Sequence, residues 1–222
     1  MDLQTLITKI TQHQLFLRLK NVIENNSYHN QEDVYSHLLK TMGIAQEQIT
    51  GSFITNPQAK ELFDQFIYVQ IQGFKRRDIM ILIALLHDIG KILSTKEGAK
   101  QKSILVTNSA DRTFCPNHEY WGSTIVGNFL HEFNLPEEVI TYIAQIIKLH
   151  DTFGDSYWDS KKSWPWELTL NDIKSRAEGY YKEALFNIYS DCFTAVPFQY
   201  GKEMIVKALN DPNLYTKREY VI

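Results

Sequence analysis

The chain has 222 residues, of which 44% are apolar and 22% are charged, and its formal net charge is −3. This composition is ordinary for a folded globular protein, and it excludes a disordered chain. Lysine and arginine number 23, against 26 aspartates and glutamates. We therefore expect no stable binding to long nucleic acids, because that affinity comes from neutralising many phosphates. A small phosphate ester would need only a few cations or a metal ion.

The two cysteines, Cys115 and Cys192, form neither a disulfide framework nor a Cys-x-x-Cys pair. Charged residues such as Asp2 and Lys9 interrupt the start of the sequence, where a signal peptide would need an apolar stretch. No run reaches the roughly 18 apolar residues of a membrane span. We expect a cytoplasmic protein without a membrane partner, and the sequence does not indicate its oligomeric state.

Helical periodicity dominates the first half of the chain. Asn30 is a suitable N-cap for one helix, and Pro57 suits the first turn of the next. The run Ile79–Leu86 is apolar on every side and ends near Gly90, which predicts a helix through the centre of the core. The helices expected in this half cover residues 3–17, a segment from 30 onward, a segment from 57 to about 69, and 76–89.

The second half contains one segment of a different character, Ser103–Phe114, which predicts a short hairpin or extended loop. Gly154 and neighbouring polar residues predict a loop over 152–165. The helices expected here cover residues 118–133, 137–149, about 170–195 and 201–209. No repeat or low-complexity linker separates these elements. The sequence therefore predicts a single all-α domain over residues 1–222, a globular helical bundle with a short insert around 103–114.

The residues that suggest chemistry are histidines and aspartates at or near predicted helix ends. Buried carboxylates are costly unless they are paired or bind a metal. Imidazole and carboxylate together suit iron, manganese, zinc, nickel or cobalt, and magnesium is a further candidate. With no thiolate cluster, a closed structural zinc site is not expected. The residues in question are His37, the pair His87-Asp88, His118, the pair His150-Asp151, and Asp191.

The order of these residues resembles the HD-domain phosphohydrolase superfamily. Residues 87–91 read His-Asp-Ile-Gly-Lys, similar to the family's central motif. Residues 118–122 read His-Glu-Tyr-Trp-Gly, which is similar to the motif that follows it in the HD region of tRNA nucleotidyltransferases, the CCA-adding enzymes. The segments 30–37 and 147–151 also resemble that group. The likeness covers about residues 28–196, and the first 26 residues are too short for the polymerase domain of those enzymes.

The resemblance implies a helical fold and one or two divalent metal ions per chain. Its implied metal ligands are His37, His87, Asp88 and Asp191, and in dinuclear relatives two further histidines hold a second ion where His118 and His150 stand. The sequence departs from the family pattern at one position. Members that cleave cyclic dinucleotides carry two adjacent histidines where this chain has Leu149 and His150. Cleavage of cyclic di-GMP is therefore not expected, and the second metal stays open.

Several other residues have both a functional and a structural interpretation. His118, His150 or Lys91 could stabilise charge or donate the proton to the leaving group, while Lys91 could instead interact with a helix dipole. Arg112 is a weak candidate for a phosphate clamp and could equally be a surface residue. Asp151 could orient a histidine or cap a helix. The three tryptophans of the predicted loop region could stack on a base or fill the edge of the core: Trp158, Trp164 and Trp166.

The expected activity is hydrolysis of a phosphate mono- or diester by water activated on the metal. The resemblance favours nucleotides, including 2′,3′-cyclic nucleotides, as the substrate class. Two alternatives come from other classes. One is a non-catalytic module that binds nucleotides or partners, and the other is a di-iron oxygenase of the same fold, which requires that His118 and His150 both bind metal.

Overall fold

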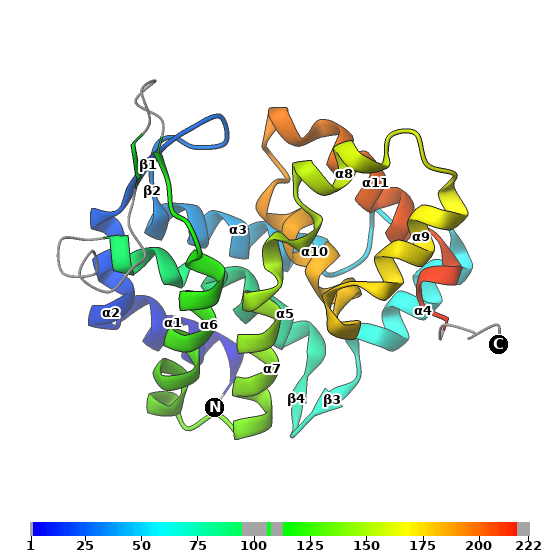
Figure 1. Ribbon diagram of the computed structural model, residues 1–222. Coiled ribbons are helices and arrows are strands. Elements are labelled where there is room, and N and C mark those ends of the chain that lie inside the picture. The colour runs from blue at the N-terminus through cyan, green and yellow to red at the C-terminus, as the bar shows by residue number, and fades with distance from the viewer. Residues whose placement is uncertain (1, 95–105, 108–112, 217–222) are drawn as a thin grey trace.

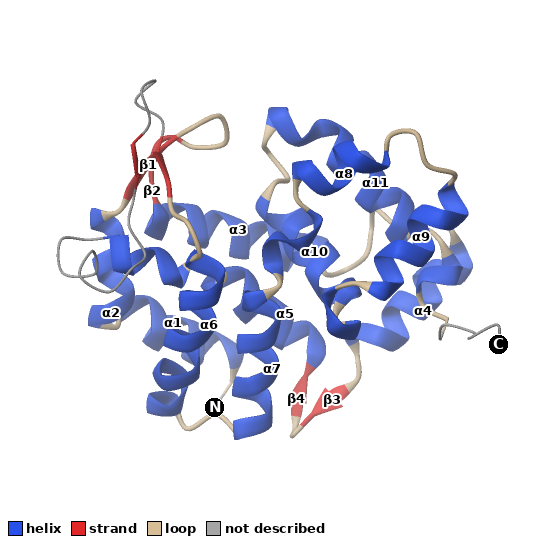
Figure 2. Cartoon of the chain, viewed as in Figure 1, coloured by secondary structure: helices blue, strands red, loops and turns tan. Residues whose placement is uncertain are grey.

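The computed structural model describes residues 2–94, 106–107 and 113–216 (Figure 1). These residues form α-helices joined by short turns and 3₁₀ helices, with three two-stranded antiparallel ribbons (Figure 2). The fold is all-α, as the sequence predicted. The helices are α1 Leu3–Gln12, α2 Gln14–Leu17, α3 Val34–Gln48, α4 Pro57–Ile67, α5 Arg76–Leu86, α6 His118–Phe129, α7 Glu137–Lys148, α8 Asp155–Lys161, α9 Trp166–Ser175, α10 Tyr181–Asp191 and α11 Gln199–Leu209. The ribbons pair β1 Ile23–Asn25 with β2 Asn30–Asp33, β3 Gln70–Ile71 with β4 Phe74–Lys75, and β5 Val106–Thr107 with β6 Thr113–Phe114.

The start of α3 differs from the prediction. Asn30 is not its N-cap, because residues Asn30–Asp33 form strand β2 and pair with β1. The cap is Asp33, whose carboxylate accepts a hydrogen bond from the backbone N–H of Ser36 at 2.9 Å. Asp33 thus ends the strand and begins the helix at once, which fixes the hairpin against α3.

The predicted insert lies partly outside the described residues. Its described ends pair as a short hairpin, with Val106 opposite Phe114 and Thr107 opposite Thr113. Thr113 also connects this ribbon to the first one, because its hydroxyl accepts a hydrogen bond from the backbone N–H of Asn25 at 2.6 Å. The prediction of a hairpin or extended insert is confirmed at these positions.

Two predictions in the second half are wrong. The expected loop over 152–165 contains helix α8, because Tyr157, Trp158 and Lys161 form a buried face at helical spacing. The expected long helix over 170–195 is two helices, α9 and α10. Between them Ala177, Glu178 and Gly179 have positive φ values, which a helix cannot contain.

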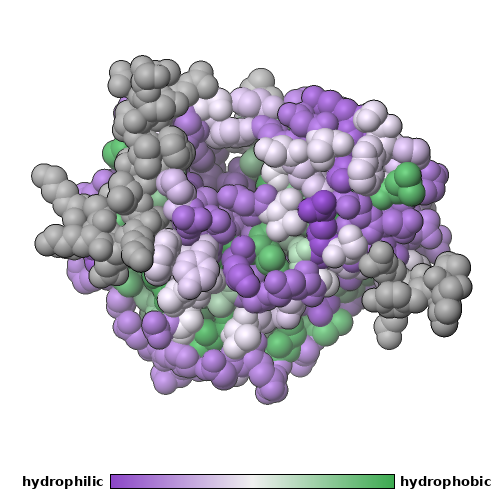
Figure 3. Space-filling model, viewed as in Figure 1, coloured by the Kyte–Doolittle hydropathy of each residue, from purple (hydrophilic) through white to green (hydrophobic). Residues whose placement is uncertain are grey.

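Two groups of buried apolar side chains form the core. One surrounds α5, in which every residue of Ile79–Leu86 is buried. The other joins α8, α9, α10 and α11, and Figure 1 shows these helices gathered in one half of the molecule. Helix α10 contributes to both groups, through Phe186 and Ile188. Hydrophilic side chains predominate on the face in Figure 3, and none of the described helices is long and apolar enough to cross a membrane.

Candidate metal centre

The end of the buried helix α5 places His87 and Asp88 inside the molecule, with 0% and 2% of their surface exposed. His87 Nδ1 lies 3.0 Å from the carbonyl oxygen of Ala84. A carbonyl can only accept, so Nδ1 carries the proton of the neutral ring and Nε2 keeps its lone pair. The fold of α5 therefore points a metal-ligating atom of His87 away from its own helix.

His37 and Asp191 come to the same place from α3 and from the end of α10. Asp191 Oδ1 lies 2.8 Å from His37 Nε2 and 3.3 Å from His87 Nε2. Asp88 Oδ2 lies 3.4 Å from His87 Nε2 and 3.7 Å from His37 Nε2. We call these four residues the four-residue cluster. His37 Nε2, His87 Nε2 and Asp191 Oδ1 are buried, and among the described residues they have no hydrogen-bond partner outside this cluster, although buried polar atoms normally find one.

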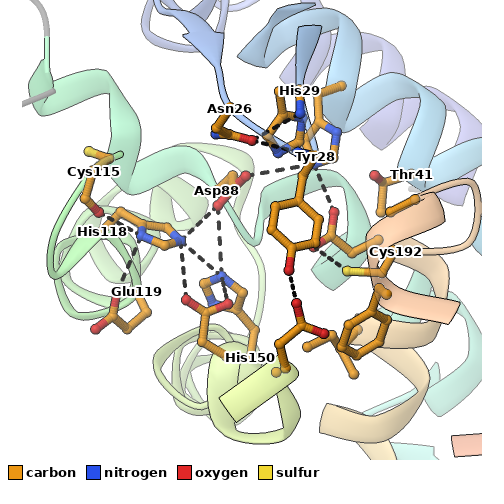
Figure 4. Close-up of a pocket in the computed structure, with 18 of the residues that line it drawn as sticks. Asn26, Tyr28, His29, Thr41, Asp88, Cys115, His118, Glu119, His150 and Cys192 are labelled. Carbon is orange, nitrogen blue, oxygen red and sulfur yellow. Dashed lines mark hydrogen bonds and ion pairs between the residues drawn. The ribbon is translucent and has the colours of Figure 1, made fainter. Parts of the chain in front are cut away.

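The other oxygen of Asp88 faces a second group, formed with His118 at the start of α6 and His150 just after α7 (Figure 4). Asp88 Oδ1 lies 3.0 Å from His118 Nε2 and 3.7 Å from His150 Nε2. The two Nε2 atoms lie 3.1 Å apart. We call these three residues the three-residue cluster, and Asp88 belongs to both clusters.

The histidines of the three-residue cluster share the tautomer of His87. His118 Nδ1 lies 2.8 Å from the carbonyl oxygen of Cys115, and His150 Nδ1 lies 2.6 Å from that of Ile147. In each case the carbonyl belongs to the residue three positions earlier. When both rings are neutral, their Nε2 lone pairs face each other, an arrangement that a cation between them would stabilise. A backbone contact of this kind is the usual support of a metal-binding histidine.

Gly90 and Gly122 allow the segment that follows α5 to approach the start of α6 closely. A Cβ at Gly90 would lie 2.0 Å from the carbonyl oxygen of His118 and 2.5 Å from the backbone nitrogen of Gly122. Both neighbours are backbone atoms that cannot rotate away. The glycines of the motifs at 87–91 and 118–122 thus permit the contact that brings His118 to Asp88. From the sequence, Gly90 was interpreted only as a helix stop and Gly122 only as a position of the second motif.

Lys91 lies beside the clusters and is buried. Its Nζ donates to Asp88 Oδ2 at 2.7 Å and to Glu24 Oε2 at 2.9 Å. Burial lowers the pKa of Lys91, but these two carboxylates raise it by more, so its pKa lies well above the ordinary value. Conversely, burial raises the pKa of Asp88, but Lys91, His87 and His118 lower it by more, well below its ordinary value. Asp88 is ionised and oriented, as a metal-ligating carboxylate must be.

The hairpin β1–β2 supplies residues that sequence reasoning missed. Glu32 Oε2 lies 3.0 Å from His29 Nδ1 and 3.7 Å from His37 Nδ1. The His37 contact lowers the pKa of Glu32, burial opposes this, and the His29 contact lowers it further, to about 2. Glu32 therefore stays ionised and orients His37 from the side away from Asp88. The strand that carries Glu32 was predicted as part of a helix, which hid this arrangement.

A pocket of about 930 Å³ opens over both clusters and reaches α8 and the turn before α11. The three-residue cluster also meets Asp151, which is 57% exposed and whose Oδ1 lies 3.3 Å from His150 Nε2. Asp151 thus faces a histidine rather than capping a helix. Trp158 is buried in the core, and Trp166 donates to Asp211 at 2.7 Å. Arg112 lies outside the described residues.

The structure brings together six of the residues singled out in the sequence: His37, His87, Asp88, His118, His150 and Asp191. Within the described residues, two groups around Asp88 could hold a metal ion, one with His37 and His87 and the other with His118 and His150. Two more lie at the edges, at His29 and Glu32 beside His37, and at Glu119 and Asp151 beside His118.

Comparison with known proteins agrees with this geometry. A family model described as the HD domain matches residues 34–178, more than half of the 222-residue chain. No curated protein matches the chain. The matched range contains five of the six clustered residues and stops before Asp191. On this match and on the paired histidine and aspartate at its centre, the chain belongs to the HD-domain family.

Proposed function

We propose that this protein is a metal-dependent phosphohydrolase. His37, His87, Asp88 and Asp191 would hold one divalent ion, and His118 and His150 would hold a second together with the other oxygen of Asp88. The observation that supports the proposal is the set of three buried polar atoms that converge beside Asp88 and, among the described residues, have no hydrogen-bond partner outside the cluster. Manganese, iron, nickel, cobalt, zinc and magnesium are the candidate ions, and donor type does not choose among them.

In this proposal the ion supplies most of the chemistry, and the remaining residues mainly hold the ligands and the substrate in position. A divalent ion supplies a Lewis acid for a phosphoryl oxygen and lowers the pKa of water, so that hydroxide is available near neutral pH. Lys91 keeps Asp88 ionised and in place through the 2.7 Å contact. His118 and His150 present Nε2 to the pocket, where either could bind the second ion or donate a proton to the leaving group. Lys91 remains a candidate for stabilising charge on the phosphate.

The substrate we propose is a small phosphate ester, with nucleotides favoured. This choice follows the resemblance of the motifs at 87–91 and 118–122 to the HD region of CCA-adding enzymes. A pocket of about 930 Å³ has room for a nucleotide. We propose no long nucleic acid and no membrane as a partner, and a cytoplasmic location.

The proposal is tested by metal content and hydrolysis together. Purified protein is reconstituted with each candidate ion, and bound metal is measured by mass spectrometry alongside a panel of phosphate mono- and diesters. We expect one or two ions per chain and hydrolysis of at least one ester class. Asp88→Asn should lose both ions and at least a hundredfold in kcat/KM, because it removes a ligand common to both clusters.

The matched control is Asp159→Asn, which makes the same chemical change at an exposed residue that pairs with Lys162. It should leave metal content and turnover unchanged. Absence of metal after reconstitution with every candidate ion would overturn the proposal and favour a non-catalytic binding module.

One observation supports a second candidate. Six residues, one of them a carboxylate shared by both clusters, suffice for two ions, which is what a di-iron oxygenase of this fold would require. Two irons per chain, with oxygen consumed and no ester hydrolysed, would select that reading over phosphate hydrolysis.

A further inference from the structure

The pocket extends well past the two clusters along α3. His37, Thr41 and Ile44 all line it, at the spacing of one helix face. With a rise of 1.5 Å per residue, Ile44 lies about 10 Å beyond His37 along the helix. Ile188 and Phe198 line the pocket from the opposite half. The part of the pocket beyond the clusters thus has an apolar wall suited to an uncharged organic group.

The charges of the pocket are predominantly negative. Of the described residues that line it, seven carry carboxylates and three carry cations. If the histidines are neutral, as they are when they bind a metal ion, the lining carries an excess of four negative charges. Two divalent ions would neutralise them, and a bound phosphate would then make the pocket negative again. The carboxylates are Glu24, Glu32, Asp88, Glu119, Asp151, Asp155 and Asp191, and the cations are Lys40, Lys91 and Arg176.

Each of the three cations already lies beside a carboxylate. Lys91 pairs with Asp88 and Glu24. Arg176 Nε lies 2.8 Å from Asp172 Oδ2. Lys40 Nζ lies 4.0 Å from Glu32 Oε1. A second anionic group on a substrate would therefore find no uncommitted positive charge among these lining residues.

Asp155 places a carboxylate on the pocket wall opposite the hairpin β1–β2. Its side chain accepts a hydrogen bond from the hydroxyl of Tyr28, which crosses the pocket from the β1–β2 turn (Figure 4). Burial raises the pKa of Asp155, as does the nearby carboxylate of Asp159. Asp155 contacts none of the six clustered residues by hydrogen bond or ion pair among the described contacts. Its charge can therefore be changed without touching the clusters.

We infer that the substrate carries a single phosphate on an organic group that is uncharged or positively charged, and that the acidic pocket wall rejects esters with a second anionic group. The inference rests on the proposed function, because the phosphate is placed at the metal clusters. It selects simple monophosphates or cyclic monophosphates from the wider class of phosphate esters. Fixed charges of one sign that line a cleft act on a ligand in this way, and the effect weakens with salt.

The test uses three aryl phosphates whose para substituents are neutral, positive and negative: phenyl phosphate, 4-(aminomethyl)phenyl phosphate and 4-carboxyphenyl phosphate. Binding to the metal-loaded protein is measured by calorimetry at low salt, and turnover is measured in parallel. We expect the carboxylate compound to bind about fivefold or more weaker than phenyl phosphate, and the amine to bind at least as tightly.

Three variants distinguish the effect of the Asp155 charge from the effect of its hydrogen bond with Tyr28. Asp155→Asn removes the charge but keeps an oxygen that can accept from Tyr28, and it should reduce the discrimination against the carboxylate about two- to threefold. Asp159→Asn makes the same change four residues along the helix, outside the pocket lining, and should leave the discrimination unchanged. Tyr28→Phe removes the hydrogen bond but not the charge, and should also preserve it.

The outcomes distinguish failure of this inference from failure of the proposed function. Equal or tighter binding of the carboxylate compound, together with turnover of any member, would overturn this inference and leave the hydrolase intact. Discrimination that is unaltered in Asp155→Asn would show that this wall is not its source. Failure of all three compounds to bind the metal-loaded protein would count against the proposed function itself.

Discussion

The four-residue cluster and the three-residue cluster share Asp88 but draw on different parts of the fold. His37 comes from within α3, His87 from the end of the buried helix α5, and Asp191 from the last residue of α10. His118 begins α6 and His150 follows α7, beside the open pocket and next to an Asp151 that is 57% exposed. The first cluster therefore joins the packed helices α3, α5 and α10, whereas the second depends on the contact of α6 with the segment that follows α5.

This difference predicts unequal metal binding. His37→Ala should abolish the more tightly held ion, because it removes one of four ligands fixed by the core. His118→Ala should leave that ion bound and remove only the second, so the protein would retain about one ion per chain. Metal content is measured after dialysis against a chelator.

The control is His131→Ala, since His131 is exposed and pairs with Glu137 away from the pocket. It should keep the full metal content. Equal loss of metal from His37→Ala and His118→Ala would mean that the two clusters bind as one unit, and the contrast drawn here would be wrong.

The contact on which the three-residue cluster depends can be broken without touching a polar side chain. Gly90→Ala would place a Cβ 2.0 Å from the carbonyl oxygen of His118, so the two segments must separate. Overpacking of this kind typically costs 1–3 kcal/mol, occasionally more, and we expect about 3 kcal/mol here. Urea unfolding of the metal-free protein measures the change.

Gly127→Ala is the matched control, because this glycine lies in α6 and a Cβ there would meet nothing within 4 Å. Alanine in a helix interior should stabilise the protein by roughly 0.5–1 kcal/mol. The two substitutions are therefore expected to have opposite signs. A Gly90→Ala variant as stable as the wild type would refute the account of how His118 is positioned.

The sequence predicted the helical class, the buried helix over 76–89, of which Arg76–Leu86 is α-helical, and the group of residues that meet at Asp88. Their role as ligands remains a prediction. The motifs could not show that Glu24 and Glu32 also approach the clusters, because strands β1 and β2 are too short to show an alternating pattern. The break between α9 and α10 was missed because positive φ at Ala177 and Glu178 cannot be recognised from residue type; Gly179, which also has positive φ, was the one signal in the sequence.

The remaining contrast between the clusters concerns protons. Burial lowers the pKa of His37, but Asp191, Glu32 and Asp88 raise it by more, to about 9. Burial lowers the pKa of His87 too, and Asp88 and Asp191 raise it by more, well above its ordinary value. A metal ion entering the four-residue cluster must therefore displace protons at neutral pH.

In the three-residue cluster, burial and the neighbouring carboxylates shift the pKa values of the two histidines in opposite directions. The pKa of His118 is raised, because Asp88 outweighs the effect of burial, whereas burial lowers the pKa of His150. His150 is therefore neutral at pH 7 and offers a lone pair without losing a proton. The four-residue cluster should release up to two protons per ion, and the three-residue cluster no more than one.

Affinity for the first ion should consequently fall as pH falls below about 9, by about tenfold per pH unit for each proton displaced. The slope is steeper for the first ion than for the second, and it flattens above pH 9, where His37 is already neutral. Competition with a fluorescent chelator between pH 6 and 9 gives both slopes, with His118→Ala isolating the first ion. An affinity for the first ion that does not change across this range would mean that His37 is not a ligand. An equal slope for both ions would mean that the clusters, though built from different parts of the fold, present the same electrostatic environment to a metal.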